Sequence, residues 1–252
     1  MNLLASSLAV VTSLTSPLSN IEFNMIALTP KQVESKLDSI ILFTPANKEG
    51  RPISFEFDVD GNKKNIYFAA FSPTAITFLN EKVLSQSNDK DVSYTYAPKS
   101  LSKFSSLLEL EKNKSKKKGF DIMYIPDPEQ AEISKKLLLE QGYKKENVNN
   151  LVQNNPMIFC PNPTVTATDK NTKSTYIPCS TDYITMKGLV DKTKIKKKYP
   201  WSKVTKPKVM AIPLSQFINT LKTSEDDNVK EIKVIPTPSS LKVINQVNSK
   251  KN

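Results

Sequence analysis

The two cysteines of this 252-residue chain, Cys160 and Cys179, are its clearest candidates for covalent chemistry. They lie in two apolar segments that resemble the arms of a hairpin, with the polar stretch TVTATDKNT between them. If the arms pair, the sulfur atoms become neighbours, and a disulfide requires Cβ atoms about 3.5–4.5 Å apart. Two reduced, partly buried thiols are the favoured interpretation, because a small offset between the arms defeats that geometry. A disulfide is the alternative, and it would indicate an oxidising compartment.

A second candidate is the lysine-rich segment 186–207, which holds eight lysines, one acidic residue and the only tryptophan. Lysines interleaved with aromatic rings can bind nucleic acid through phosphate contacts and stacking. The same composition suits an anionic lipid surface. A solvated loop is the third interpretation, because charge runs are usually solvated. The residues that would contact an anionic surface are Lys194, Lys196, Lys197, Lys198, Tyr199 and Trp201.

Catalytic chemistry has little support in the sequence. The chain has no histidine, which removes the commonest general base and metal ligand. It has only five glycines and no phosphate-binding glycine motif. Glu129 and Glu132 share one predicted helix, but acidic residues in a first turn normally interact with the helix dipole. We therefore expect a protein that is not an enzyme and that binds no cofactor and no metal.

The predicted elements repeat. Five times an apolar run meets a proline and continues as a helical pattern, since proline ends a strand and is tolerated at the first helical position. Ser72-Pro73, Asp127-Pro128 and Thr237-Pro238 add an N-cap oxygen before that proline. The strands of these strand-proline-helix units begin at Ile66, Val92, Asp121, Lys208 and Ile232.

Two predicted hairpins accompany these units. The first joins SIILFTP to PISFEF, and the second joins NPMIFCPNP to KSTYIPC. The order hairpin, unit, unit occurs twice, with the unit that begins at Asp121 as a link, which indicates internal duplication. The predicted fold is α/β, a mixed sheet with flanking helices in two pseudo-repeated halves. The halves, 28–112 and 113–252, would form one domain, and 186–207 would be an insertion in the second.

Charge is unevenly distributed. The net charge is +11, and residues 1–110 carry 10 basic and 11 acidic residues, so the excess of positive charge lies in the remainder. Such asymmetry indicates an acidic partner or an anionic membrane, or simply a solvated basic surface. Residues 1–27 are a weak leader, an amphipathic segment that touches a membrane, or part of the fold. No run approaches the 18–20 apolar residues, approximately, that span a bilayer.

Taken together, the segments resemble the Tic-twenty-two-like family, a small soluble component of the translocon of the chloroplast inner envelope. The resemblance is carried by ALTPKQVESKLDSIILFTPANKEGRPIS at 27–54, IYFAAFSPTAITFL at 66–79, FDIMYIPDPEQ at 120–130, NPMIFCP at 155–161 and KVMAIPLSQFINTL at 208–221. It implies a pseudo-symmetric α/β fold with apolar grooves, no enzymatic role and a part in moving precursor or envelope proteins. The lysine-rich insertion and the weak targeting sequence depart from the family pattern.

We therefore expect a non-enzymatic factor of plastid protein import or envelope biogenesis. It would bind other proteins, precursors or translocon components, in a chaperone-like way through apolar grooves. It would be soluble or peripheral at the plastid envelope, with an anionic membrane surface as a further partner. The alternative is a basic protein associated with organellar nucleic acid or ribosomes, although nucleic acid is not the expected partner.

Overall fold

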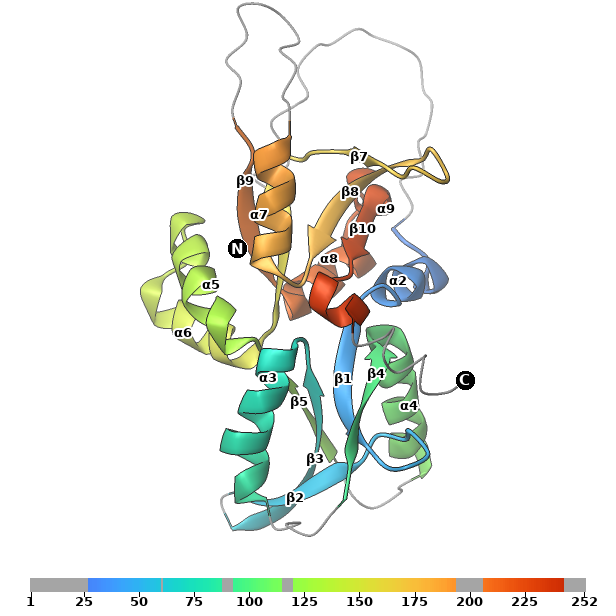
Figure 1. Cartoon of the computed structure of the whole chain (residues 1–252), viewed down its shortest axis with the longest axis vertical. Helices are drawn as coiled ribbons and strands as arrows, with labels where there is room; N and C mark the ends of the chain where they lie inside the picture. The colour runs from blue at the N-terminus through green and yellow to red at the C-terminus, as the bar shows by residue number, and fades with distance from the viewer. Residues whose placement is uncertain (1–26, 60, 88–92, 115–119, 194–205, 243–252) are drawn as a thin grey trace, which may run out of the picture.

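The structure is a computed structural model that describes residues 27–59, 61–87, 93–114, 120–193 and 206–242. It contains two mixed β-sheets with helices packed around them (Figure 1). This is the α/β architecture that the sequence predicts. The first sheet consists of β1 (Ile41–Ala46), β2 (Ser54–Val59), β3 (Asn62–Ala70), β4 (Thr95–Ser100) and β5 (Phe120–Ile125). The second consists of β6 (Met157–Asn162), β7 (Ala167–Thr168), β8 (Thr175–Ser180), β9 (Lys208–Pro213) and β10 (Ile232–Ile235).

The two sheets have the same topology. In the first, β1 lies between β4 and β3 and is antiparallel to both, while β5 is parallel to β3. In the second, β6 takes the place of β1, β9 of β4, β8 of β3 and β10 of β5, with the same strand directions. The short β7 pairs with β8 as β2 pairs with β3. Duplication of a single unit would produce this arrangement.

Four helices follow the same order in each half, and α9 has no counterpart among the described residues of the first half. The first half contains α2 (Pro30–Leu37), α3 (Pro73–Phe78), α4 (Leu101–Lys114) and α5 (Pro128–Glu140). The second contains α6 (Lys145–Asn154), α7 (Tyr183–Lys192), α8 (Leu214–Thr223), α9 (Asn228–Glu231) and a short helix at 238–242. A π-turn, Leu79–Val83, and a 3₁₀ turn, Leu84–Gln86, extend α3.

The structure corrects the predicted boundary between the halves. The sequence pattern treats the unit that begins at Asp121 as a link and assigns it to 113–252. In the structure its strand, β5, pairs along its whole length with β3 of the first sheet. The reason is long-range strand pairing, which a local pattern does not reveal. The first half therefore extends through α5, and the second begins near α6.

The predicted first hairpin also differs. The β1 and β2 segments make a single bridge, Ala46 with Pro52, and the tight hairpin is formed by β2 and β3. An Asp-Gly dipeptide at 60–61 precedes β3, and Gly61 has a positive φ of 75°. Asp-Gly is a strong hairpin signal because such turns need residues that tolerate positive φ. The register of β3 is therefore set by this turn.

Most of the strand-proline-helix junctions form as predicted. Ser72 and Asp127 cap α3 and α5, and a proline follows each cap. Thr29 caps α2 through a capping box with Gln32, as its sequence predicts. Two prolines differ from the prediction: Pro213 is the last residue of β9 rather than the first of α8, and Pro98 lies inside β4 rather than at the start of α4. β4 is the last strand in the order of its sheet, where a missing N–H is tolerated.

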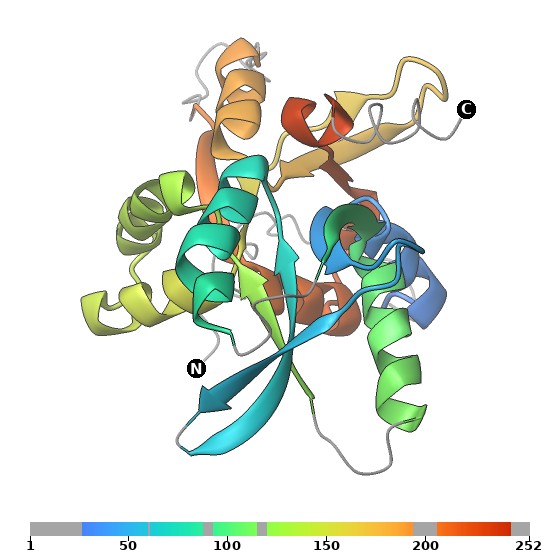
Figure 2. The same ribbon diagram turned by 60° about the horizontal axis from the view of Figure 1, so that its bottom comes forward.

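A single hydrophobic cluster connects the halves. Alternate residues of β3 and β6 point to opposite faces of their sheets, as the strand period requires. Ala69 of the first sheet and Ile158 of the second enter this shared core, together with Phe104 of α4 and Phe217 of α8. The shared core joins both halves, and α3 and α4 lie on either side of the first sheet (Figure 2).

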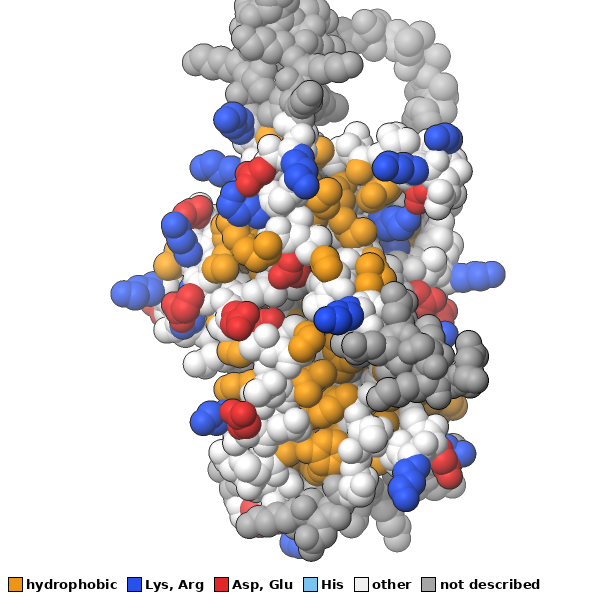
Figure 3. Space-filling model, in the orientation of Figure 1, with side chains coloured by type: hydrophobic (Ala, Val, Ile, Leu, Met, Phe, Trp, Pro, Cys, Tyr) orange, Lys and Arg blue, Asp and Glu red, His pale blue; other side chains and the backbone are white. Residues whose placement is uncertain are grey.

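The outer faces of the two sheets are covered differently. On the second sheet, Phe159 and Ala211 pack with side chains of α5, α6 and α7. On the first sheet, Phe68 packs with α3 and its extension, and Tyr94 and Tyr96 remain partly exposed beside them. Figure 3 shows hydrophobic side chains at the surface between α3 and β4. In the described part of the chain, no helix is long and apolar enough to cross a membrane.

Candidate functional site

In the structure, Cys160 and Cys179 form a disulfide, whereas the favoured interpretation of the sequence is two reduced thiols. The pairing of Phe159 with Ser180 sets the cysteines opposite each other on β6 and β8, with Cα atoms 4.4 Å apart. Antiparallel partners that do not share hydrogen bonds lie at about this spacing, about 4.5 Å. The two cysteines are therefore direct cross-strand partners, without the offset between the strands that would keep their sulfur atoms apart. Both cysteines are buried in the shared core, so the bond cross-links the second sheet.

The predicted anionic-surface residues lie outside the described part of the chain. These are Lys194, Lys196, Lys197, Lys198, Tyr199 and Trp201. The described residues 186–193 belong to α7 and its C-cap. The contact of this segment with lipid or nucleic acid therefore stays a prediction from the sequence.

A hollow among the described residues lies between the two halves, at the ends of four strands. It has a volume of about 520 Å³, within the range typical of ligand-binding sites. Its walls come from the junctions β3–α3, β5–α5 and β8–α7 and from the start of the helix at 238–242. We call this hollow the junction cleft. Its lining residues are Phe71, Ser72, Pro73, Thr74, Asp127, Glu129, Gln130, Ile133, Thr181, Asp182, Ile184, Thr237 and Ser239.

Four helix caps meet at the junction cleft. Ser72 Oγ accepts a hydrogen bond from Ala75 N, and Asp182 Oδ2 accepts one from Thr185 N. The strand registers make these two caps equivalent, because Ala70 and Ser180, each two residues earlier, both pair with a phenylalanine. Asp127 and Thr237 also cap their helices from equivalent positions. Each lies two residues after an isoleucine, Ile125 or Ile235, that pairs with Ala70 or Ser180. The cleft is therefore built from corresponding residues of both halves.

The walls of the cleft are partly apolar. Phe71 lies at one side, where its ring packs against Tyr124 at a centroid distance of 5.9 Å. Ile133 of α5 is half-buried, and Ile184 of α7 is 66% exposed. An exposed isoleucine at the rim of a hollow provides apolar area that a partner can bury.

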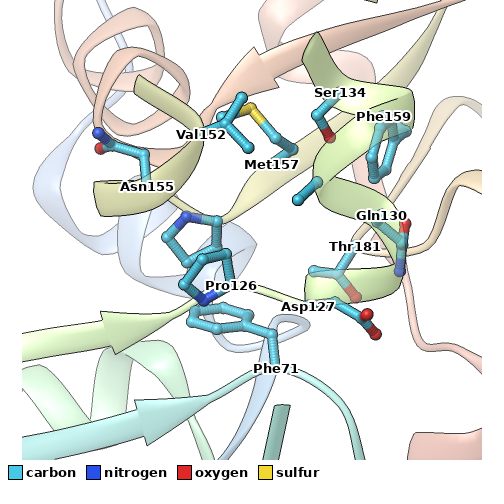
Figure 4. Close-up of a pocket in the computed structure, with 12 residues that line it drawn as sticks. Phe71, Pro126, Asp127, Gln130, Ser134, Val152, Asn155, Met157, Phe159 and Thr181 are labelled. Atoms are coloured by element: carbon cyan, nitrogen blue, oxygen red, sulfur yellow. The ribbon is translucent and has the colours of Figure 1, made fainter. Parts of the chain in front are cut away.

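A hydrogen bond across the halves fixes the geometry of the cleft. The backbone N–H of Tyr183 donates to Oε1 of Gln130 at 2.8 Å, which joins the first turns of α7 and α5. Gln130 also lines a smaller hollow next to the cleft, with Phe71, Asp127 and Thr181 shared between the two (Figure 4). This smaller hollow has about 20 Å³, enough for about one water molecule. It lies between α5 and the start of β6.

The cleft carries three carboxylates, those of Asp127, Glu129 and Asp182. None of the described residues that line it is a lysine or arginine. Figure 3 shows acidic side chains near the middle of the molecule, between patches of hydrophobic ones. Within the described ranges, no group of three or more Cys, Asp or Glu side chains is arranged to hold a metal ion. The arrangement suits non-covalent binding of an amphipathic partner.

The sequence identifies some of the residues that line this cleft, but it does not show that they come together. The three predicted cap-proline dipeptides, at Ser72, Asp127 and Thr237, all line it. The sequence pattern assigns Glu129 only to the helix dipole, and it does not single out Asp182. The similarity of IPDPEQ at 125–130 to IPTPSS at 235–240 aligns the caps Asp127 and Thr237 and includes Glu129, but it does not reach Asp182.

Comparison with known proteins gives the fold. Neither models of known protein families nor curated protein sequences match the chain. Among solved structures, it is similar to Anabaena Tic22, a protein of protein transport, with 19% identity and a TM-score of 0.64 over 87% of this chain and 97% of that one. It is also similar to Tic22 from Plasmodium falciparum, with 16% identity and a TM-score of 0.55 over 86% of this chain and 98% of that one. As the resemblance in sequence predicts, the chain has the Tic22-like fold.

Proposed function

We propose that this chain is a non-enzymatic factor of protein transport that binds polypeptide, and that it works in the plastid. The fold it shares with Anabaena Tic22, a protein of protein transport, supports this role. The observation that carries the proposal is the junction cleft, a hollow of about 520 Å³ between the halves with partly apolar walls and an exposed isoleucine at its rim. Its partners are other proteins, precursors or components of the envelope machinery.

Binding is chaperone-like in this proposal. The client contributes apolar side chains to Ile184 and Ile133 at the cleft, and to the partly exposed face near Tyr94 and Tyr96 on the first sheet. Burial of apolar area contributes about 25 cal/mol per Å², so a few side chains give weak, reversible binding once the ordering cost is subtracted. The protein is soluble or peripheral at the envelope.

The direct test is suppression of aggregation of a chemically denatured client protein. The wild-type chain should reduce light scattering, and Ile184→Ser should reduce this effect by about half, because it removes an exposed apolar contact without opening the core. Leu110→Ser is the matched control, since Leu110 is 55% exposed on α4 and does not line the cleft. No suppression by wild-type protein in stoichiometric excess would contradict the proposal.

A further inference from the structure

We propose that the junction cleft selects cationic polypeptide segments, those in which a lysine or arginine stands next to an apolar residue. This inference rests on the proposed polypeptide-binding function and specifies the chemistry of the client. It is carried by the shape of the cleft and by the charges in its lining, which differ from those of the rest of the chain. The whole chain has a net charge of +11, yet the cleft contributes three carboxylates.

The charge balance of the cleft decides between a cation and an anion. Four helices begin at the cleft, α3, α5, α7 and the helix at 238–242, and each N-terminus contributes about half a positive charge. Their sum, about +2, would favour an anion if it acted alone. The carboxylates of Asp127, Glu129 and Asp182 contribute three full negative charges, so the balance in the cleft is negative.

Two of these carboxylates have a structural role that leaves capacity for a ligand. Asp127 uses Oδ1 to accept from Glu129 N at 2.8 Å, and Asp182 uses Oδ2 to accept from Thr185 N. A carboxylate has two oxygens and about four acceptor positions, so a single backbone N–H does not saturate it. Glu129 is exposed in the first turn of α5. A cationic side chain can therefore approach all three groups from within the cleft.

The apolar residues of the cleft favour client segments with apolar groups next to the charge. The methylene stems of lysine and arginine pack along apolar surface while their charged ends reach polar groups. Phe71, Ile133 and Ile184 provide that surface beside the carboxylates. The distributed positive charge of the protein is screened beyond about 8 Å at physiological ionic strength, so the local carboxylates determine the attraction. An acidic segment would face the same carboxylates and be excluded.

The test uses three fluorescent peptides of equal length in which leucine alternates with lysine, glutamine or glutamate. Binding to the full chain is measured by fluorescence anisotropy. We expect the lysine peptide to bind about tenfold more tightly than the glutamine peptide, on the basis of three partly screened ion pairs. The glutamate peptide should bind most weakly. Added salt should reduce the advantage of the lysine peptide.

The triple variant Asp127→Asn, Glu129→Gln, Asp182→Asn should abolish the preference for lysine. Asparagine caps helices as well as aspartate does, so the fold is retained. Glu129→Gln, whose residue caps no helix, is the single variant that should show part of the loss. The matched control, Glu109→Gln, Glu140→Gln, Glu225→Gln, makes the same change in net charge at exposed positions outside the cleft and should keep the preference.

The outcomes separate the two proposals. Equal binding of the lysine and glutamine peptides by wild-type protein would overturn the charge selection while leaving polypeptide binding in place. The charge selection is overturned as well if the triple variant and the matched control behave alike. If no peptide of any charge binds and aggregation is not suppressed, the proposed function itself fails.

Discussion

The two halves of this molecule share a strand order but are closed in different ways. In the second half, α5 and α6 cover the outer face of the sheet, and a disulfide connects β6 to β8 on the inner face. In the first half, the positions that correspond to the cysteines are Thr44 and Ala69, and the outer face keeps two partly exposed tyrosines. Among the described residues, the same strand order therefore occurs in one closed sheet and in one more open sheet.

One source of the cover on the second sheet is α5, the last helix of the first half. It has 13 residues, and its Leu138 packs in the cluster on the outer face of the second sheet. Among the described residues, the corresponding helix of the second half, 238–242, contributes no side chain to the cluster on the outer face of the first sheet. The same strand order can thus keep a common core under different covers, and the first sheet has apolar surface to offer a partner.

The largest expected effects come from the core that the halves share. Phe104 of α4 and Phe217 of α8 occupy equivalent positions, and they are 0% and 2% exposed. We expect Phe104→Ala and Phe217→Ala each to lower the free energy of unfolding by about 3–5 kcal/mol, because both create a cavity in the same cluster. Urea denaturation followed by circular dichroism should show one cooperative transition for each variant.

If the two halves unfolded independently, the wild-type protein would show two transitions. Each alanine variant would then shift one of two transitions and leave the other in place. Leu110→Ala is the control for helix α4, since Leu110 is exposed and its loss should cost less than about 0.5 kcal/mol.

The next largest effect on stability is expected from the disulfide, which the first half lacks at the corresponding positions. Its cysteines are 19 residues apart in sequence, and closing a loop of about this length stabilises a protein by about 3 kcal/mol. Cys160→Ala with Cys179→Ala should therefore lower the denaturation midpoint, and reductant should affect wild-type protein alone. Two free thiols, titrated in denaturant without reductant, would contradict the bond.

The first half offers the reciprocal experiment. Thr44→Cys with Ala69→Cys places cysteines at the corresponding register positions of β1 and β3. We expect this pair to oxidise and to raise the denaturation midpoint by less than the native bond does, since engineered disulfides usually deliver less. Failure to form the bond would show that the two sheets differ in more than side chains.

The edge strands are protected by different devices. In the second sheet, Gln141, the C-cap residue of α5, binds the backbone of β9 twice: Ala211 N donates to Oε1 at 2.8 Å, and Nε2 donates to Ala211 O at 2.9 Å. The corresponding position on β4 is Pro98, which has no N–H. Gln141→Ala should cost about 1–2 kcal/mol, because both backbone groups lose a part-buried partner.

Aggregation is the more specific readout of that edge. An exposed strand edge templates pairing with other chains, so Gln141→Ala should aggregate faster at equal fraction unfolded. Gln216→Ala is the control, because it removes a bond from Tyr143 on the same side of the sheet but leaves β9 capped. Equal aggregation of the two variants would show that Gln141 acts only through stability.

How far the sequence predicts this molecule depends on the range of the interactions. Local signals predict the capped starts of α2, α3 and α5, because a cap and a proline act within one turn. The pairing of β5 with β3 depends on residues more than 50 positions apart, and the sequence pattern assigns β5 to the wrong half. The convergence of Asp127 and Asp182 at one cleft requires the same long-range pairings in both sheets, so no local pattern contains it.

The smallest expected effect concerns one surface ion pair in each half. In the second half, Lys233 of β10 donates to Asp169 at 3.0 Å, and this bond, with the backbone N–H groups of Asn171 and Thr172, lowers the pKa of Asp169 to about 2. The pKa in the unfolded chain is about 3.9, so the stabilisation is present above about pH 4. It is lost as the pH falls through the folded value toward 2.

In the first half, an ion pair at a different register position joins β3 to β5, with Lys64 Nζ and Asp121 Oδ2 3.4 Å apart. Asp169→Asn should therefore lower the melting temperature slightly at pH 6 and flatten its decline between pH 4 and 2. Asp121→Asn should change both less, since its pair is more exposed than that of Asp169. Calorimetry across this pH range measures both variants. Equal pH profiles for the two would show that the carboxylates contribute alike, and that the halves differ only in their covers and their cross-link.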